Sequence, residues 1–148
     1  MNKTPVRQLL RRKGTSVITI DPGATVYDAI ATMVDHNVGA IVATVDGALA
    51  GIFTERDYLR RIVLRGRTSK TTALKEVMTT DLITVGPDTT VEAALSVMTE
   101  ARCRHLPVVV DERLSGVVSI GDCVKQVSRI ARSRVEELKK YISGQYPA

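Results

Sequence analysis

The chain repeats itself once, and this internal repeat restricts the fold more than any other feature of the sequence. When the sequence is shifted by 65 residues, positions 18–58 align with positions 83–123 without a gap, and 12 of the 41 aligned pairs are identical. Several other pairs exchange one apolar residue for another, as in Ile30 with Leu95 and Ile52 with Val117. Because self-similarity marks one structural unit used more than once, we expect two copies of a single supersecondary unit.

Each copy has the pattern strand, helix, strand, strand, helix. Short β-branched and apolar runs alternate with segments whose apolar residues recur every three or four positions, which is the spacing of an amphipathic helix. Asp46-Gly47 is a strong signal for a two-residue hairpin. Pro107 has no N–H for a sheet ladder, so we expect it at a strand start or at an unpaired edge. The expected strands are 16–20, 38–45, 49–53, 82–85, 106–110 and 114–118, and the expected helices are 26–34, 54–66, 91–98 and a last one from about 119 to 141 or beyond.

Two such units, each with one apolar sheet face, can bury those faces against each other around a pseudo-twofold axis. The sequence therefore predicts an α/β (α+β) fold of two βαββα repeats, with the sheets packed together and the helices outside. The expected division is an N-terminal segment at 1–14, a first repeat at 15–68, a linker and leading segment at 69–79, a second repeat at 80–125, and a C-terminal helix and tail at 126–148.

The composition is that of a globular protein. With 148 residues, 44% hydrophobic and 25% charged, the chain can bury a core as one domain or as two small halves. No window approaches the roughly 18–20 uninterrupted apolar residues of a membrane helix, and the N-terminus has no apolar signal region. We therefore expect a cytoplasmic protein that does not bind membranes. Cys103 and Cys123 lack metal-ligand spacing, so we expect reduced, partly buried thiols and no metal site.

The charge is mildly basic, because 21 Lys and Arg stand against 16 Asp and Glu. A basic surface favours anionic partners such as nucleotides or nucleic acid. Aromatic residues make up only 3% of the chain, which leaves few platforms for stacking bases and counts against a nucleic-acid partner. The excess charge lies in two clusters, one of Arg7, Arg11, Arg12 and Lys13, the other of Arg60, Arg61, Arg65, Arg67 and Lys70.

One motif occurs at the same place in both copies. It reads glycine, two apolar residues, Thr or Ser, two variable residues and Asp, as GIFTERD at 51–57 and GVVSIGD at 116–122. Two copies of this motif at a fixed spacing, within matching βαββα units, resemble a tandem pair of cystathionine-β-synthase (CBS) domains. The resemblance covers about residues 5–142.

The motif suits a nucleotide at the junction of a strand and a helix. Unpaired N–H groups at a helix N-terminus and a nearby hydroxyl favour a phosphate, and the two oxygens of Asp57 or Asp122 can accept both hydroxyls of a ribose. The competing interpretation is a capping box, in which Thr54 with Asp57, or Ser119 with Asp122, satisfies the first N–H groups of a helix and binds nothing.

The resemblance implies a bound adenosine compound, namely AMP, ADP, ATP or NAD(H), with S-adenosylmethionine ranked behind them and no required cofactor. It also implies two composite sites. The second-motif site would comprise Asp122, Ser119, Gly121, Arg104, His105, Leu106, Pro107, Thr15, Val17, Ile18 and Thr19. The first-motif site would comprise Asp57, Thr54, Arg56, Gly39, Ala40, Ile41, Met78, Leu82 and Thr84. Arg56 or His105 could face phosphates, although a solvated Arg56 and a capped His105 are equally compatible with the sequence.

These features favour a regulatory protein that is not an enzyme. The sequence contains no motif for hydrolysis, metal chemistry or P-loop phosphoryl transfer, and the CBS-like pair leaves no part of this sequence for a catalytic domain. We therefore expect a stand-alone sensor that reports energy or redox state to an unknown client protein. The resemblance further implies a homodimer in which two pairs form a flat disk. A basic nucleic-acid-binding or general interaction protein with no nucleotide ligand is the alternative, and an enzyme that consumes the nucleotide is a third.

Overall fold

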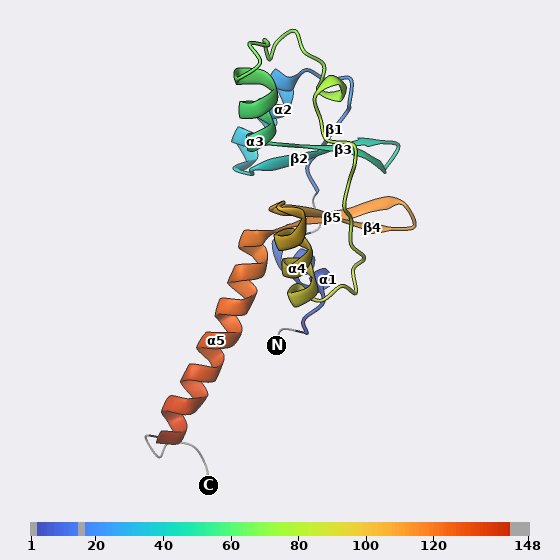
Figure 1. The fold of residues 1–148 in the computed structure, drawn as a ribbon. Coiled ribbons are helices and arrows are strands. Elements are labelled where there is room, and N and C mark those ends of the chain that lie inside the picture. Colours follow the sequence, from blue (N-terminus) through green and yellow to red (C-terminus); the bar gives the residue numbers. More distant parts are fainter. Residues whose placement is uncertain (1–2, 15–16, 143–148) are drawn as a thin grey trace.

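The protein consists of two stacked halves, each a small sheet with helices on its outer face (Figure 1). The structure is a computed structural model that describes residues 3–14 and 17–142. Its helices and helical turns are α1 (Val6–Lys13), α2 (Val26–His36), α3 (Glu55–Asp57), η1 (Tyr58–Val63), η2 (Leu74–Glu76), α4 (Val91–Ala101) and α5 (Ile120–Ile142). Its strands are β1 (Thr19–Ile20), β2 (Ala40–Val45), β3 (Ala48–Thr54), β4 (His105–Val110) and β5 (Arg113–Ser119).

The strand order confirms the twofold repeat. The five strands form one hydrogen-bonded order, β1-β2-β3-β5-β4, in which β3 and β5 are joined only at the pair Ala48 and Arg113. The β2–β3 hairpin shifts register between Ala43 and Thr44, and the β4–β5 hairpin shifts between Val108 and Val109, positions that correspond under the repeat. The α/β fold of two like units with helices outside is therefore as the sequence predicts.

Each half has its own hydrophobic core between the sheet and its helices. In the first half Ile41, Ala43 and Phe53 pack toward α2 and η1. Successive strand residues point to opposite faces, so the buried neighbours Val42 and Ile52 face the other half. The main cores thus lie under the helices, and the contact between the two sheets is the smaller one.

Each core is completed by the segment that leads into the other repeat. Val6 and Leu9 of α1, which precedes the first repeat, are buried in the core of the second half. Leu74 and Val77, which precede the second repeat, are buried in the core of the first half. The segments assigned from the sequence to an N-terminal segment (1–14) and to a linker and leading segment (69–79) therefore contribute to the two cores, through α1 and through Leu74 and Val77.

Two expected strands are shorter than the sequence suggests. The strand expected at 16–20 is described only at Thr19–Ile20, and Ser16 lies outside the described residues. The segment 82–85 is not a strand, and only Val85 forms a bridge, with Val108 of β4. Val85 N–H donates to the carbonyl of Pro107, which offers no N–H in return, so the ladder cannot lengthen there. Pro107 therefore lies in the edge strand of the sheet order, as predicted, although its carbonyl is paired with Val85.

The helices agree with the apolar spacing, apart from one that was not predicted. α2, α4 and α5 cover the expected ranges, and the helix expected at 54–66 is the short α3 followed by the π-helical turn η1. Helix α1 was missed, although Pro5 before it and Gly14 after it are the residues that favour a helix start and a helix end. No described helix has the length and hydropathy needed to cross a membrane.

Candidate functional site

Both motifs form capping boxes at the starts of their helices. Thr54 N–H donates to Asp57 Oδ2 at 3.0 Å, and Asp57 N–H donates to Thr54 Oγ1 at 3.1 Å. In the second half Ser119 N–H donates to Asp122 Oδ2 at 2.8 Å, and Asp122 N–H donates to Ser119 Oγ at 3.1 Å. The boxes occupy Oδ2 of each carboxylate and leave Oδ1 outside them, so capping and ligand binding can use the same acid.

A cavity of about 660 Å³ lies beside the second motif. Its volume is in the range of small-molecule sites in proteins. It joins four parts of the chain: the helix α1, the segment before β1, the start of β2, and the hairpin β4–β5. The lining residues are Arg7, Leu10, Arg11, Lys13, Gly14, Val17, Ile18, Asn37, Val38, Gly39, Ala40, Val42, His105, Ser115, Gly116, Val117, Ser119 and Asp122.

An ion pair spans one side of this cavity. Lys13 Nζ lies 2.8 Å from Asp122 Oδ2 and donates a second hydrogen bond, of 2.9 Å, to the carbonyl of Val117. The Asp122 side chain is only 16% exposed. Burial raises the pKa of Asp122, but the hydrogen bonds from Lys13 and from Ser119 outweigh it and hold the pKa below its ordinary value. Asp122 is therefore a carboxylate at neutral pH.

His105 lines the same cavity as an uncharged side chain. Burial lowers the pKa of His105, and the positive charges of Lys13 and Arg104 lower it further, against the opposing effects of Asp122 and Glu55. A neutral imidazole can donate one hydrogen bond and accept another. His105 therefore offers a ligand hydrogen bonds rather than a positive charge.

The cavity gathers about half of the residues predicted for the second-motif site. Asp122, Ser119, His105, Val17 and Ile18 line it as expected. Leu106 and Pro107 were also expected there, but their side chains are buried, so only their backbone groups can serve a ligand. The lining does not include Arg104, Gly121 or Thr19, and Thr15 lies outside the described residues.

Gly39 and Ala40 adjoin both motif sites. They were assigned to the first-motif site, and they do adjoin it, because Glu55 N–H donates to the carbonyl of Gly39 and Ala40 pairs with Thr54. Both also line the cavity of the second motif. The Ile41 side chain is buried in the first core, so only its backbone groups can serve a ligand.

The first motif is covered by the segment that leads into the second repeat. Met78 lies over the motif glycine, so that a Cβ at Gly51 would lie 2.5 Å from Met78 Sδ, and Thr79 pairs with Ile52 as a bridge. Leu82 is half-buried, and Thr84 and Arg56 are exposed. The basic group near Asp57 is that of Arg61, whose Nε lies 3.8 Å from Asp57 Oδ1, and not that of Arg56.

Sequence reasoning missed the contribution of α1 to the site. Arg7, Leu10, Arg11, Lys13 and Gly14 all line the cavity, whereas from the sequence its basic residues were only a charged cluster. A helix signal at 6–13 directly before the first repeat was the available clue.

Comparisons with known proteins agree with this architecture. The profile of the CBS domain matches residues 6–64 and 74–129. The chain is 44% identical over 152 residues to the CBS domain-containing protein CBSX3, mitochondrial, of Arabidopsis thaliana, covering 97% of this chain and 74% of that protein. It is 38% identical over 115 residues to the CBS domain-containing protein YhcV of Bacillus subtilis (strain 168), covering 77% and 81%. The crystal structure of the CBS-domain containing protein ATU1752 from Agrobacterium tumefaciens matches with a TM-score of 0.78 and 38% identity, covering 83% of this chain and 98% of that one. The chain belongs to the CBS-domain family and carries two copies of the domain.

Proposed function

We propose that this protein is a non-catalytic regulatory module that binds an adenine nucleotide in the cavity beside Asp122. The observation that carries the proposal is the cavity itself, which brings the second motif together with both halves and with a basic helix. A ligand held there contacts the first half through Gly39 and Ala40 and the second half through Asp122. Its binding can therefore favour one arrangement of the halves over another, which is what a sensor requires.

The chemistry of the lining supports a nucleoside phosphate. Asp122 can accept ribose hydroxyls, and the N-terminus of α5 with the hydroxyl of Ser119 suits a phosphate. Val17, Ile18 and Val42 supply apolar surface for a base that is held without aromatic stacking. AMP, ADP, ATP and NAD(H) meet these requirements, and S-adenosylmethionine ranks behind them because it lacks phosphate.

Thermal unfolding with each compound tests the proposal. A ligand at 100 times its dissociation constant adds about 2.7 kcal/mol to the free energy of unfolding, which raises Tm by several degrees. Asp122→Asn removes one carboxylate oxygen from the site while keeping an acceptor for the helix cap, so the Tm increase should be lost in this variant. Asp57→Asn is the matched control in the other motif. If no compound raises Tm, or if Asp122→Asn responds like the parent, the proposal is wrong.

The same proposal includes a homodimer and a client protein. Apolar side chains on the outer helices are exposed, including Tyr27 and Val34 on α2 and Leu59 and Val63 on η1. Two copies that pair through these helices would cover them. Light scattering after gel filtration tests the dimer, and a monomeric mass at micromolar concentration would exclude it.

The predicted cytoplasmic location is open to test by cell fractionation, because a 44% identical relative is named as mitochondrial.

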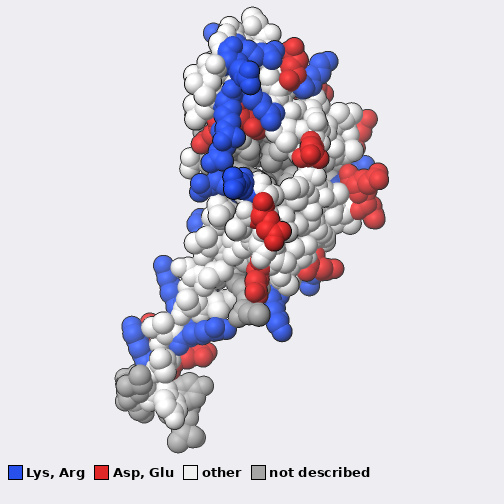
Figure 2. Space-filling model, in the orientation of Figure 1, with Lys and Arg blue, Asp and Glu red and all other residues white. Residues whose placement is uncertain are grey.

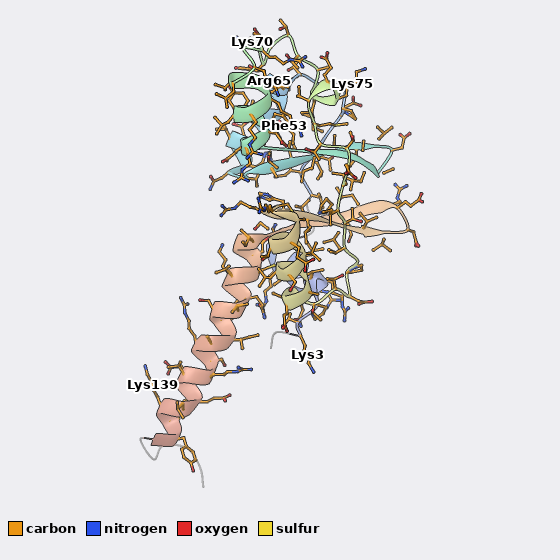
Figure 3. The ribbon with its side chains drawn as sticks, viewed as in Figure 1. Lys3, Phe53, Arg65, Lys70, Lys75 and Lys139 are labelled. Atoms are coloured by element: carbon orange, nitrogen blue, oxygen red, sulfur yellow. The ribbon has the colours of Figure 1, made fainter. Side chains whose placement is uncertain are left out.

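A nucleic-acid partner is the second candidate, and one surface favours it. Figure 2 shows a band of Lys and Arg over the first half, on the side of η1, where Figure 3 labels Arg65 and Lys70. Phosphate-driven binding weakens steeply with salt, whereas binding in a pocket weakens little. Gel-shift titration of RNA and DNA over a salt series separates the two functions.

Prolonged incubation with ATP and NADH, followed by chromatography, tests the proposal that neither is consumed.

A further inference from the structure

The segment before the first repeat (residues 3–14) and the segment before the second repeat (residues 69–79) are the two leading segments of the chain. In their first part they make equivalent contacts. In the first, Val6 N–H donates to the carbonyl of Thr89, just before α4. In the second, Leu74 N–H donates to the carbonyl of Ala24, just before α2, and the carbonyl of Thr72 accepts from Val26 N–H. Each segment thus forms an antiparallel bridge with the start of a helix of the other repeat. Leu10 then lies over Gly116 in the same way that Met78 lies over Gly51.

The equivalence ends after Leu10. Leu10 and Met78 are 68 positions apart, whereas Gly51 and Gly116, like the rest of the repeat, are 65 apart. The first leading segment is therefore three residues longer than the second between this point and the first strand. The additional three residues lie between Leu10 and Ile18, a stretch that begins with the basic last turn of α1, Arg11, Arg12 and Lys13. Gly14, with φ of 96°, ends the helix directly after Lys13.

This basic turn makes the two motif acids unequal. Lys13 extends from it across the cavity and pairs with Asp122 at 2.8 Å. In the second leading segment the chain instead passes from Met78 into the bridge between Thr79 and Ile52. Asp57 is left with the weaker partner Arg61, from its own helix, at 3.8 Å.

Lys13 Nζ donates to Asp122 Oδ2, the oxygen that also accepts from Ser119 N–H, so a ribose that uses both carboxylate oxygens meets Lys13 at one of them. A ligand that takes both oxygens must compete with Lys13, and the Lys13 ammonium group, on a side chain that is 43% exposed, gains a new charged partner only if the ligand brings an anion. A phosphate attached to the ribose is such an anion. Arg7 and Arg11 line the same cavity and add to the positive potential there.

We propose that Lys13 is a specificity-determining latch, which competes with ribose for Asp122 and is released to the phosphate of the ligand. The site therefore selects nucleotides over uncharged nucleosides and over cationic adenosine compounds. This inference rests on the proposed function and specifies its ligand class. It also assigns the selectivity to the second-motif site alone, since the first leading segment is the one with the basic turn.

Calorimetric titration with adenosine and AMP tests the latch, because the two compounds differ only in the phosphate. The parent should bind AMP more tightly than adenosine. In Lys13→Met adenosine should bind more tightly than it does to the parent, because its competitor is gone, and the preference for AMP should fall about tenfold, the effect of one charge-assisted hydrogen bond. Lys13→Arg keeps the charge and should keep the preference. Lys75→Met, an exposed lysine of the other leading segment, is the matched control and should behave like the parent.

The outcomes separate this inference from the function on which it rests. If Lys13→Met keeps the parent's ratio of AMP to adenosine affinity, or binds adenosine no more tightly, the latch is wrong while nucleotide binding stands. If the parent binds neither AMP nor any other adenosine compound, both are wrong. Lys13→Gln, which keeps a polar end near Asp122, repeats the comparison if Lys13→Met does not fold.

Discussion

Gly51 and Gly116 hold the same position in the two repeats, and each lies under a side chain of a leading segment. A Cβ at Gly116 would lie 2.6 Å from Leu10 Cδ2, and one at Gly51 would lie 2.5 Å from Met78 Sδ. The absence of a side chain at these two positions is what allows the leading segments to pack on β5 and β3. Leu10 also lines the cavity, so its position affects the shape of the site.

We predict that Gly116→Ala destabilises the protein by about 1–3 kcal/mol, the usual cost of an added methyl group in a packed region. Because the overlap is with one flexible side chain, Leu10→Ala should remove part of the cost. Urea unfolding of the two single variants and the double variant measures this coupling. Additive effects of the two substitutions would contradict the packing described here.

The ion pair between Lys13 and Asp122 predicts a pH dependence of stability. The pKa of Asp122 is lowered in the folded state, so the carboxylate contributes stability above its unfolded pKa, near 4, and this contribution is lost as the pH falls through the folded pKa. Lys13→Met should therefore be less stable than the parent at pH 6.5, and the difference should be smaller at pH 3, which lies below the unfolded pKa of an aspartate. Urea midpoints at the two pH values provide the measurement. An equal difference at both would show that Lys13 acts through packing alone.

The motif residues were predictable from the sequence because a capping box is local, with the hydroxyl and the acid three positions apart. Lys13 was not predictable in the same way. Its contact with Asp122 joins residues 109 positions apart and depends on where the helix α1 ends. Local spacing thus identifies the acid of the site, whereas its partner follows from the tertiary fold.

At the scale of elements, α5 has two parts with different roles. Its first turns carry the buried residues Cys123 and Gln126, and Arg12 of α1 donates a hydrogen bond to Gln126. From Ala131 to Tyr141 every described side chain is exposed, and the helix extends away from the body of the protein (Figure 1). The distal part therefore contributes little to the stability of a single chain.

A chain that ends after Arg132 should keep the Tm of the parent within a few degrees, because the side chains at 133–141 are exposed and a change at an exposed position usually alters the free energy of unfolding by about 0.5 kcal/mol or less. Gln126→Ala in the full chain is the contrasting variant and should lower Tm, since it leaves Arg12 without its partner. A large loss of Tm in the shortened chain would mean that the distal helix is packed against another copy.

Elements with long apolar periodicity were predictable, and short ones were not. α2 and α4 each have an apolar stripe and a capping threonine, Thr25 and Thr90, and both were found close to their actual bounds. The strand expected at 82–85 looks like its partner at 18–20 in sequence, but its outcome depends on Pro107 of the neighbouring strand. Whether so short a segment forms a strand depends on the hydrogen-bonding groups of the neighbouring strand, which the residues of the segment itself do not encode.

At the scale of the whole molecule, the repeats are joined by exchange of their leading segments. The chain enters through α1, whose apolar face belongs to the second half, and crosses between the halves through Leu74 and Val77, which belong to the first. The internal repeat predicted two like units, but not which segment completes which core. That assignment is a property of the pseudo-twofold arrangement, because each leading segment packs where the other half leaves its sheet and helix uncovered.

This exchange predicts that a core substitution in a leading segment destabilises the half into which that segment packs, and not the repeat that the segment precedes along the chain. Leu9→Ala and Leu74→Ala should each cost about 2–5 kcal/mol, as expected for buried leucines. Leu74→Ala should reduce hydrogen-exchange protection first in α2 and β2, and Leu9→Ala first in α4 and β4. A loss of protection in the repeat that each segment precedes along the chain would contradict the exchange. Equal losses in both halves would instead mean that the two cores unfold as one unit, with the cavity beside Asp122 lost along with them.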